Sequence, residues 1–185
     1  DVARKYDASF KAIVGDALLD TGFPLIHAVG RAAKEAPRLL HLSWGEASAP
    51  RVAIVGKGVT FDTGGLDIKP SSGMRLMKKD MGGAAHALGL AQIVMDAKLP
   101  VKLDVFLPVV ENAIAGDAFR PGDVIKSRKG LTVEIDNTDA EGRLILADAL
   151  ARASEDDPAL LLDFATLTGA ARTALGPDLP PFYTN

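Results

Sequence analysis

The chain has 185 residues, of which 48% are hydrophobic and 24% are charged, a size and composition that suit one domain with a buried core. Its 21 Lys and Arg against 24 Asp and Glu give a formal net charge of −3, which argues against nucleic-acid or anionic-membrane partners. The absence of cysteine excludes disulfides, thiolate metal sites and cysteine nucleophiles. With only three histidines, any metal or acid–base site must be built mainly from carboxylates, lysine or arginine.

Apolar runs and helical spacing predict strands and helices that alternate along the chain. In the first part we expect an apolar run at 10–14, a helix over 23–36, strands at 38–44 and 52–55, and a Gly-rich loop over 57–73. In the second part we expect a buried helix within 74–98, strands at 101–110 and 131–135, a helix over 142–153, a strand at 160–164 and a short helix at 169–175. This alternation predicts an α/β fold with a mixed, largely buried sheet sandwiched by helices.

The two ends of the chain and its hydropathy bear on its origin. No apolar run approaches the roughly 18 residues of a membrane span, and the start at Asp1 has neither the shape nor the charge order of a signal peptide. We therefore expect a cytoplasmic protein. Because the chain begins without Met and stops soon after a predicted strand, we also expect it to be a fragment of a longer protein.

The Gly56-Lys57-Gly58 segment follows a predicted strand but fits no nucleotide-binding motif. A P-loop needs Ser or Thr where Gly58 stands, and a dinucleotide-binding fingerprint needs glycine or alanine at Phe61. The H-E-x-x-H and G-x-S-x-G motifs are also absent.

Several charged residues in the two polar stretches, 57–80 and 136–143, are candidates for a site. Asp139 and Glu141 are two residues apart, so on an extended segment both carboxylates point the same way and can grip a hard cation, although such a pair before a helix can also be a cap. Asp80 falls within an otherwise apolar stretch predicted to be helical, where a buried carboxylate needs an ion pair or a metal. The residues alone leave both possibilities open.

Arg143 would lie in the first turn of a helix, where a cation opposes the helix dipole. His86 is predicted to be a hydrogen-bonded core residue rather than a ligand.

Four blocks of sequence occur in a characteristic order. They are Val55-Gly-Lys-Gly-Val-Thr-Phe-Asp-Thr-Gly-Gly, Asp80-Met-Gly-Gly-Ala-Ala, Asn137-Thr-Asp-Ala-Glu-Gly-Arg-Leu and Ala165-Thr-Leu-Thr-Gly-Ala. Together they resemble the leucyl aminopeptidases, the cytosol aminopeptidase family of two-metal exopeptidases, from about residue 23 to the end. The resemblance implies a zinc-exopeptidase-like fold. Residues 1–185 would be a partial catalytic domain that lacks the family's N-terminal domain and the end of its catalytic domain.

By motif position, the resemblance also implies a site. Two divalent metal ions, Mn²⁺ or Zn²⁺, would be held by Lys57, Asp62, Asp80, Asp139 and Glu141. An ammonium has no lone pair to give, so a lysine ligand is credible only beside a strong cation that holds it neutral. Lys69 matches the lysine that stabilises the tetrahedral intermediate, and Arg143 matches the arginine that holds a bicarbonate ion as general base. The implied substrate contacts are Lys57, Asp62, Lys69, Asp80 and Met77.

The implied activity is metal-dependent removal of the N-terminal residue from peptides that carry a free α-amine, by water activated by the two metal ions. The longer protein would be a homohexamer with no nucleic-acid or membrane partner. A non-catalytic metal-binding scaffold or assembly module of the same fold is the alternative, but a scaffold has no need of Lys69 or Arg143. A metal-dependent phosphoester hydrolase is disfavoured because the three histidines lie away from the motifs.

Overall fold

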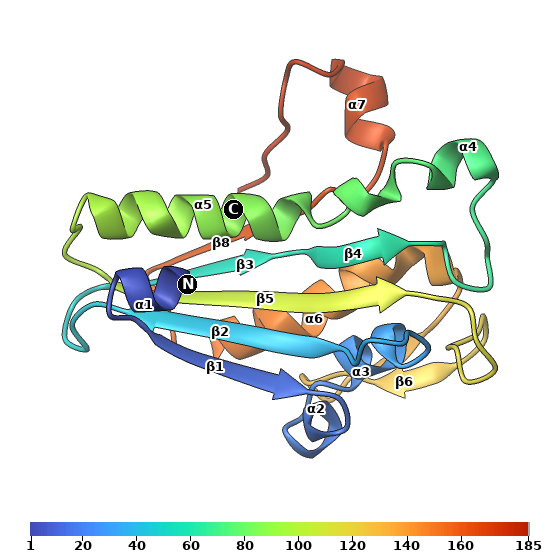
Figure 1. Cartoon of the computed structure of the whole chain (residues 1–185), viewed down its shortest axis with the longest axis horizontal. Helices are drawn as coiled ribbons and strands as arrows, with labels where there is room; N and C mark the ends of the chain where they lie inside the picture. The colour runs from blue at the N-terminus through green and yellow to red at the C-terminus, as the bar shows by residue number, and fades with distance from the viewer. Residues whose placement is uncertain (185) are drawn as a thin grey trace.

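The computed structural model describes residues 1–184 and shows a mixed sheet with helices on both faces (Figure 1), which confirms the predicted fold class. The strands are β1 (Ser9–Val14), β2 (Arg38–Trp44), β3 (Arg51–Gly56), β4 (Gly58–Asp62), β5 (Lys102–Asn112), β6 (Val124–Lys126), β7 (Thr132–Glu134) and β8 (Leu160–Phe164). The α-helices are α1 (Val2–Lys5), α2 (Ala17–Asp20), α3 (Pro24–Gly30), α4 (Ser71–Met74), α5 (Gly82–Asp96), α6 (Glu141–Ser154) and α7 (Ala170–Leu175). Two 3₁₀ turns, η1 (Met77–Lys79) and η2 (Thr138–Ala140), precede α5 and α6.

The main sheet has the strand order β1-β2-β5-β3-β8. β1 and β2 are antiparallel, β2 is antiparallel to β5, and β3 runs parallel to both β5 and β8. β4 pairs in parallel with the second half of β5, so β3 and β4 follow one line beside that long strand. The parallel strands therefore end at one edge of the sheet, where polar groups of α/β proteins usually gather.

Lys57 interrupts the line between β3 and β4. Its backbone N–H donates to the Phe164 carbonyl at 2.9 Å, and its carbonyl accepts from the Ala84 N–H at 2.8 Å. These bonds join β3, β8 and the start of α5 at one point. Neither backbone group of Lys57 is therefore available to pair with β5. The Lys57 side chain lies against Gly142, where an added Cβ would come within 2.4 Å of the lysine Cε.

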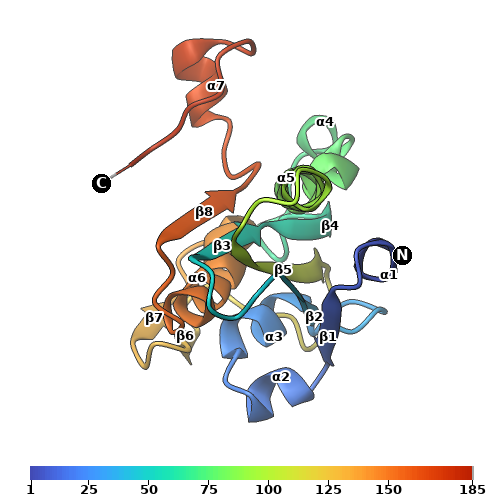
Figure 2. The ribbon, with the colours of Figure 1, turned by 90° about the vertical axis from the view of Figure 1, so that its left-hand side faces the viewer.

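α5 covers one face of the sheet, and α3 and α6 cover the other, as the view along the sheet shows (Figure 2). The face of α5 toward the sheet repeats every four residues at Gly83, Ala87, Ala91 and Met95, the helical spacing of a buried stripe. Small residues let the helix lie close, since an added Cβ at Gly83 would reach within 2.1 Å of the Phe164 carbonyl oxygen. No helix of residues 1–184 is long and apolar enough to span a bilayer.

Three of the predicted elements differ in the structure. The helix expected over 23–36 ends at Gly30, because the chain turns back there and an added Cβ at Gly30 would lie 2.5 Å from the Pro37 Cβ. The expected 57–73 loop contains β4, which continues the pairing along β5. The helix expected within 74–98 is divided into η1 and α5, and Asp80 ends η1 instead of lying within a helix.

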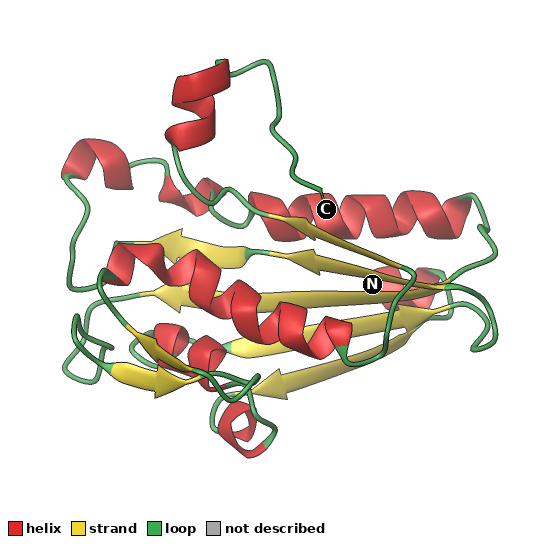
Figure 3. Ribbon diagram, turned by 180° about the vertical axis from the view of Figure 1, so that it is seen from behind, coloured by secondary structure: helices red, strands yellow, loops and turns green. Residues whose placement is uncertain are grey.

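The hairpin of β6 and β7 was only half predicted. Its second strand matches the strand expected at 131–135, but β6 is three residues long and too short for its alternation to stand out. The hairpin forms a separate two-stranded sheet below the main one (Figure 3).

Candidate metal centre

The predicted ligands come together at the edge of the sheet where the parallel strands end. Lys57 follows β3, Asp62 ends β4, Asp80 lies between η1 and α5, and Asp139 and Glu141 lie at the junction of η2 and α6. The chain reaches this edge from both faces of the sheet, since α5 and α6 lie on opposite faces and both begin there (Figures 1 and 3).

Lys57 lies between two buried carboxylates. Its Nζ is 2.7 Å from Asp80 Oδ2 and 2.9 Å from Glu141 Oε1, and all three side chains are nearly inaccessible to solvent. Burial is the largest influence on the lysine and lowers its pKa, but the attraction of Glu141 and Asp80 outweighs it and the pKa of Lys57 is raised. Without a metal, Lys57 is therefore an ammonium ion.

Lys69 makes a second bridge of the same kind. Its Nζ lies 3.0 Å from Asp62 Oδ2 and 2.5 Å from Asp139 Oδ1. Burial lowers the pKa of Lys69, and hydrogen bonds to Asp139 and Asp62 outweigh it, so this pKa is also raised. Lys79, whose side chain is half-exposed, adds a third ammonium group 3.5 Å from Asp80 Oδ1. Two enclosed ammonium ions and this outer one thus stand beside four carboxylates, which still outnumber them.

Three of these carboxylates lie close together. One oxygen from each of Asp62, Asp139 and Glu141 lies within 4.8 Å of the others. Burial raises the pKa of Glu141 to about 7, with the attraction of Lys57 opposing it and the charge of Asp62 adding to it. Glu141 Oε2 is buried and accepts no hydrogen bond from residues 1–184. Oxygen donors in this arrangement fit hard divalent cations, so the residues present suit a metal site.

Comparison with known proteins identifies a family that matches the whole chain. The family model described as "Cytosol aminopeptidase family, catalytic domain" matches residues 1–185. The chain belongs to the cytosol aminopeptidase family.

Two curated members of this family illustrate the similarity. A probable cytosol aminopeptidase from Corynebacterium glutamicum is 56% identical over 162 residues, which are 86% of this chain and 32% of that protein. Peptidase B from Pectobacterium carotovorum is 48% identical over 180 residues, which are 95% of this chain and 41% of that protein. The chain thus spans 32% of the length of the first relative and 41% of the second.

Solved structures of the family have the same fold. The crystal structure of cytosol aminopeptidase from Coxiella burnetii superposes with a TM-score of 0.92 at 59% identity, covering 96% of this chain and 38% of that one. Leucyl aminopeptidase from Trypanosoma brucei, in complex with bestatin, superposes with a TM-score of 0.90 at 41% identity, covering 94% and 34%. The mixed sheet with helices on both faces is therefore the fold of the family's catalytic domain.

The pairing of Asp139 with Glu141 has a different local basis from the one predicted. The two residues do not lie on an extended segment, because Asp139 is in the 3₁₀ turn η2 and Glu141 is the first residue of α6. Asn137 caps the turn by accepting a hydrogen bond from the Asp139 N–H at 2.7 Å. Their carboxylates lie close together because α6 begins directly after η2, so both side chains extend from one tight turn of the backbone.

The remaining predicted residues differ in exposure. Arg143 lies in the first turn of α6 as predicted and is exposed, and its side chain makes no hydrogen bond or ion pair with any other residue of the described chain. Met77 begins η1 and is partly buried. His86 is hydrogen-bonded to the Gly82 carbonyl at 2.7 Å, but the prediction that it is a core residue is wrong because it lies on the exposed side of α5.

Sequence reasoning missed three polar residues that stabilise the site, two of which hold its carboxylates. Thr166 donates a hydrogen bond from Oγ1 to Asp80 Oδ1 at 2.7 Å, and Asn112 donates from Nδ2 to Asp62 Oδ1 at 2.9 Å. The buried Thr138 donates from Oγ1 to the Gly64 carbonyl at 2.6 Å. No local signal marks Asn112, because it stands two residues beyond the 101–110 run, after Glu111.

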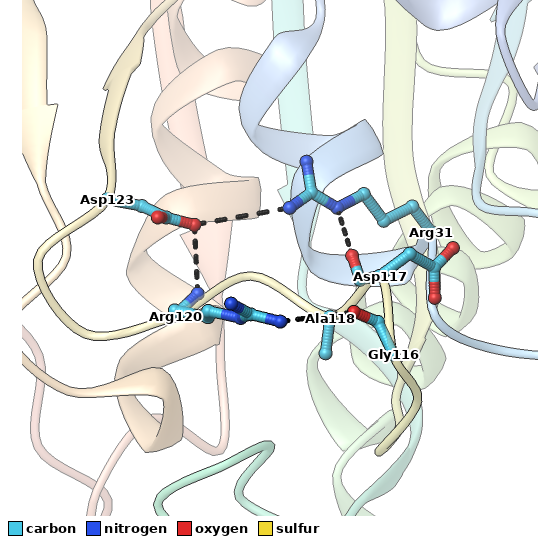
Figure 4. A pocket seen from close by; sticks show the side chains of 6 residues that line it. All are labelled: Arg31, Gly116, Asp117, Ala118, Arg120 and Asp123. Atoms are coloured by element: carbon cyan, nitrogen blue, oxygen red, sulfur yellow. Dashed lines mark hydrogen bonds and ion pairs between the residues drawn. The ribbon is translucent and has the colours of Figure 1, made fainter.

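Two surface pockets lie apart from this cluster, and neither is lined by a predicted ligand. One, of about 260 Å³, lies between the end of α3 and the loop after β5 (Figure 4). There Arg31 donates from Nε to the Asp117 carbonyl at 2.6 Å, and Arg120 donates its backbone N–H to Asp123 at 2.9 Å. The Arg31 guanidinium also lies 4.0 Å from the Asp123 carboxylate. The other, of about 480 Å³, is an apolar groove beside α5 that includes His86.

Proposed function

We propose that this chain is part of the catalytic domain of a metal-dependent aminopeptidase and carries its metal ligands and catalytic groups. The observation that carries this proposal is the cluster of four buried or half-buried carboxylates around two lysines at the edge of the sheet. Its membership of the cytosol aminopeptidase family supports the same activity.

The five proposed metal ligands are Lys57, Asp62, Asp80, Asp139 and Glu141. When bound, two divalent cations acidify water and polarise the carbonyl of the scissile peptide bond. We propose Mn²⁺ or Zn²⁺, because the donor set of oxygens and one amine suits either ion. Lys57 can serve as a ligand only after it loses its proton, so cation binding must overcome the attraction that Asp80 and Glu141 exert on its ammonium.

Lys69 is proposed to stabilise negative charge on the oxygen of the substrate carbonyl. Its ammonium bridges Asp62 and Asp139, two of the proposed metal ligands, and this supports a role for it at the reacting carbonyl. A fixed cation in a site sheltered from water is worth on the order of 10²–10³ in rate at comparable sites. Lys69→Ala should lower turnover by about that factor with the metal content unchanged. Loss of a metal ion in this variant would show that the roles of Lys57 and Lys69 are divided differently.

Arg143 is proposed to hold a bicarbonate ion, which would supply a general base. The side chain stands in the first turn of α6, two residues after Glu141, and no other described residue engages its guanidinium. Such a planar guanidinium matches the two oxygens of a small oxyanion. This assignment also accounts for a site without a histidine base, because the proton would be handed to a bound anion.

Substrates of the proposed enzyme are peptides with a free N-terminus, and the longer protein is proposed to be a homohexamer. A non-catalytic metal-binding scaffold is the second candidate. The test is to add Mn²⁺ to the full-length protein and compare hydrolysis of an aminoacyl amide with that of its N-acetylated counterpart. Rapid hydrolysis of the free amine alone supports the proposal. Equal hydrolysis of both would exclude selection of the α-amine, and no hydrolysis despite bound metal would favour the scaffold.

A further inference from the structure

We infer that Asn112 is a positioning residue that holds the two metal-binding segments of the centre in a fixed relation. The inference rests on the proposed function, because it assigns a role at the same site. Asn112 is the last residue of β5 and is 0% exposed. Its amide nitrogen donates to Asp62 Oδ1 at 2.9 Å and to the Thr138 carbonyl at 3.1 Å.

These two acceptors belong to segments far apart in the sequence. Asp62 ends β4, whereas Thr138 begins the turn η2 that leads to Asp139 and Glu141. A single amide group therefore ties the strand end that carries one proposed ligand to the turn that carries two others. The strand β5 supplies a rigid base for this tie, because β4 pairs along it and the Thr63 hydroxyl donates to the Asn112 carbonyl at 2.7 Å.

The orientation of the amide follows from the chemistry of its partners. A carboxylate and a backbone carbonyl are both acceptors only, so the Asn112 nitrogen must face them. Its Oδ1 is then buried and has no hydrogen-bond partner among residues 1–184. A buried acceptor without a partner is unfavourable. The amide nevertheless keeps this orientation, because turning it over would place its oxygen against two other oxygens.

The contact also determines how Asp62 presents its carboxylate. Oδ1 accepts from the Asn112 amide and from the Gly64 N–H at 2.9 Å, while Oδ2 lies 3.0 Å from Lys69 Nζ. Two donors therefore hold Oδ1, and Oδ2 is the oxygen turned toward the centre. Polar groups that orient a ligand in this way commonly contribute to metal affinity without touching the metal.

Close packing leaves the amide little freedom. Gly65 lies against it with a φ of +66°, and an added Cβ there would come within 2.9 Å of Thr138 Oγ1 and 3.0 Å of Asn112 Oδ1. The side chain of Asn112 thus fills a gap between the two segments and cannot swing away from Asp62.

The test is the variant Asn112→Leu, which keeps a similar shape and removes both donors. Calorimetric titration of the metal-stripped, full-length protein with Mn²⁺ should show an affinity about 10–100-fold weaker than in the unchanged protein. Turnover should recover at excess Mn²⁺, because the ligands themselves remain. An unchanged Mn²⁺ affinity in the folded variant would overturn the inference.

Asp148→Asn is the matched control. Asp148 is also 0% exposed and accepts hydrogen bonds from the backbone N–H groups of Leu25 and Arg128, each at 2.8 Å, away from the metal centre. Both variants should melt at a lower temperature, but only Asn112→Leu should bind Mn²⁺ more weakly. An equal loss of affinity in both would show that general destabilisation is the cause and would overturn the inference.

Two further outcomes separate the inference from the proposed function. If the unchanged protein binds no Mn²⁺, the proposed function fails, whereas normal binding with an unaffected Asn112→Leu variant contradicts the inference alone. If Asn112→Leu does not fold, the Nδ2 protons of the unchanged protein provide the test by NMR. Slow hydrogen exchange and a shift on Zn²⁺ addition are expected, and fast exchange with no shift would overturn the inference.

Discussion

Buried carboxylates lie at both ends of the central strands. At one end the acid has a basic partner on each oxygen, and at the other end the acids outnumber their cationic partners. At the edge where β5 begins, Asp104 has a side chain only 4% exposed and receives one partner on each oxygen. His41 Nε2 lies 2.8 Å from Oδ1, and Arg51 Nη1 lies 2.5 Å from Oδ2. At the edge where β5 ends, four carboxylates share the two enclosed ammonium groups of Lys57 and Lys69 and the half-exposed one of Lys79.

The pKa values follow this difference. Burial is the largest influence on Asp104 and raises its pKa, but hydrogen bonding from His41 and the charge of Arg51 outweigh it, so the pKa of Asp104 is lowered. Burial raises the pKa of Glu141 to about 7, even though Lys57 opposes it. A buried acid with enough positive partners stabilises the fold, whereas buried acids in excess of their partners are suited to bind cations.

The largest effect is a loss of metal affinity, expected when one carboxylate of the proposed metal centre is removed. Asp139→Asn removes one charged oxygen donor from a side chain that is 32% exposed, so the fold should be retained. Affinity for Mn²⁺ should fall by ~100-fold or more, since a ligand lost costs at least as much as a group that orients one. Metal analysis after dialysis measures this. Full metal content in the variant would contradict the view that the excess charge binds cations.

Replacing Asp104 should instead change the stability of the fold and leave metal binding intact. Asp104→Asn should lower the free energy of unfolding at neutral pH by about 2 kcal/mol, because charged hydrogen bonds are lost. Mn²⁺ affinity should be unchanged. Urea unfolding and Mn²⁺ titration of the same sample test both statements, and weaker metal binding would show that the two ends of the sheet are not independent.

The pH dependence of Asp104 has a definite sign. Because its folded-state pKa lies below the ordinary value of 3.8, the ionised group contributes stability that is fully present above that pH and is lost as the pH falls through the folded value. The unchanged protein should therefore lose more stability on acidification below about pH 4 than Asp104→Asn does. Equal losses, measured by urea unfolding at each pH, would contradict this account.

A smaller loss of stability is expected when a methyl group is added beside Lys57, the buried cation of the proposed metal centre. In Gly142→Ala the new Cβ would lie 2.4 Å from the Cε of Lys57, whose buried side chain has little room to move. Overpacking of this kind should cost about 1 kcal/mol in unfolding free energy, and Mn²⁺ should bind more weakly because Lys57 is displaced. Thermal unfolding with and without Mn²⁺ measures both. A variant equal to the unchanged protein would show that Lys57 moves freely.

The smallest effect on stability is expected from Asp156, which lies at the exposed side of the Asp104–Arg51 pair. Asp156 is 32% exposed and pairs with Arg152 at 2.7 Å and with Arg51 at 3.7 Å. Asp156→Asn should change the free energy of unfolding by about 0.5 kcal/mol or less, because exposed ion pairs are weak. A loss comparable to that of Asp104→Asn would show that Asp156 maintains the buried pair.

Local sequence patterns predicted the parts of this fold that are long and regular. The apolar runs of β2, β5 and β8 and the helical spacing of α6 were all found. β4 was missed because its first residue follows Lys57 directly, within a stretch whose glycines favour a loop. The single helix expected around Asp80 was wrong because the turn η1 separates this residue from α5.

The site divides in the same way between sequence and structure. The order and spacing of the motifs determined which residue types are available, because a chain without cysteine and with three histidines must build a metal or acid–base site mainly from carboxylates, lysine or arginine. Only the tertiary structure decided that these residues meet, since Lys57, Asp80 and Glu141 lie on separate elements that approach from both faces of the sheet. The surplus of negative charge is likewise a tertiary property, because the balance of buried charges depends on distances that local sequence does not determine. The same reason explains why Asn112 could be identified only from its contacts.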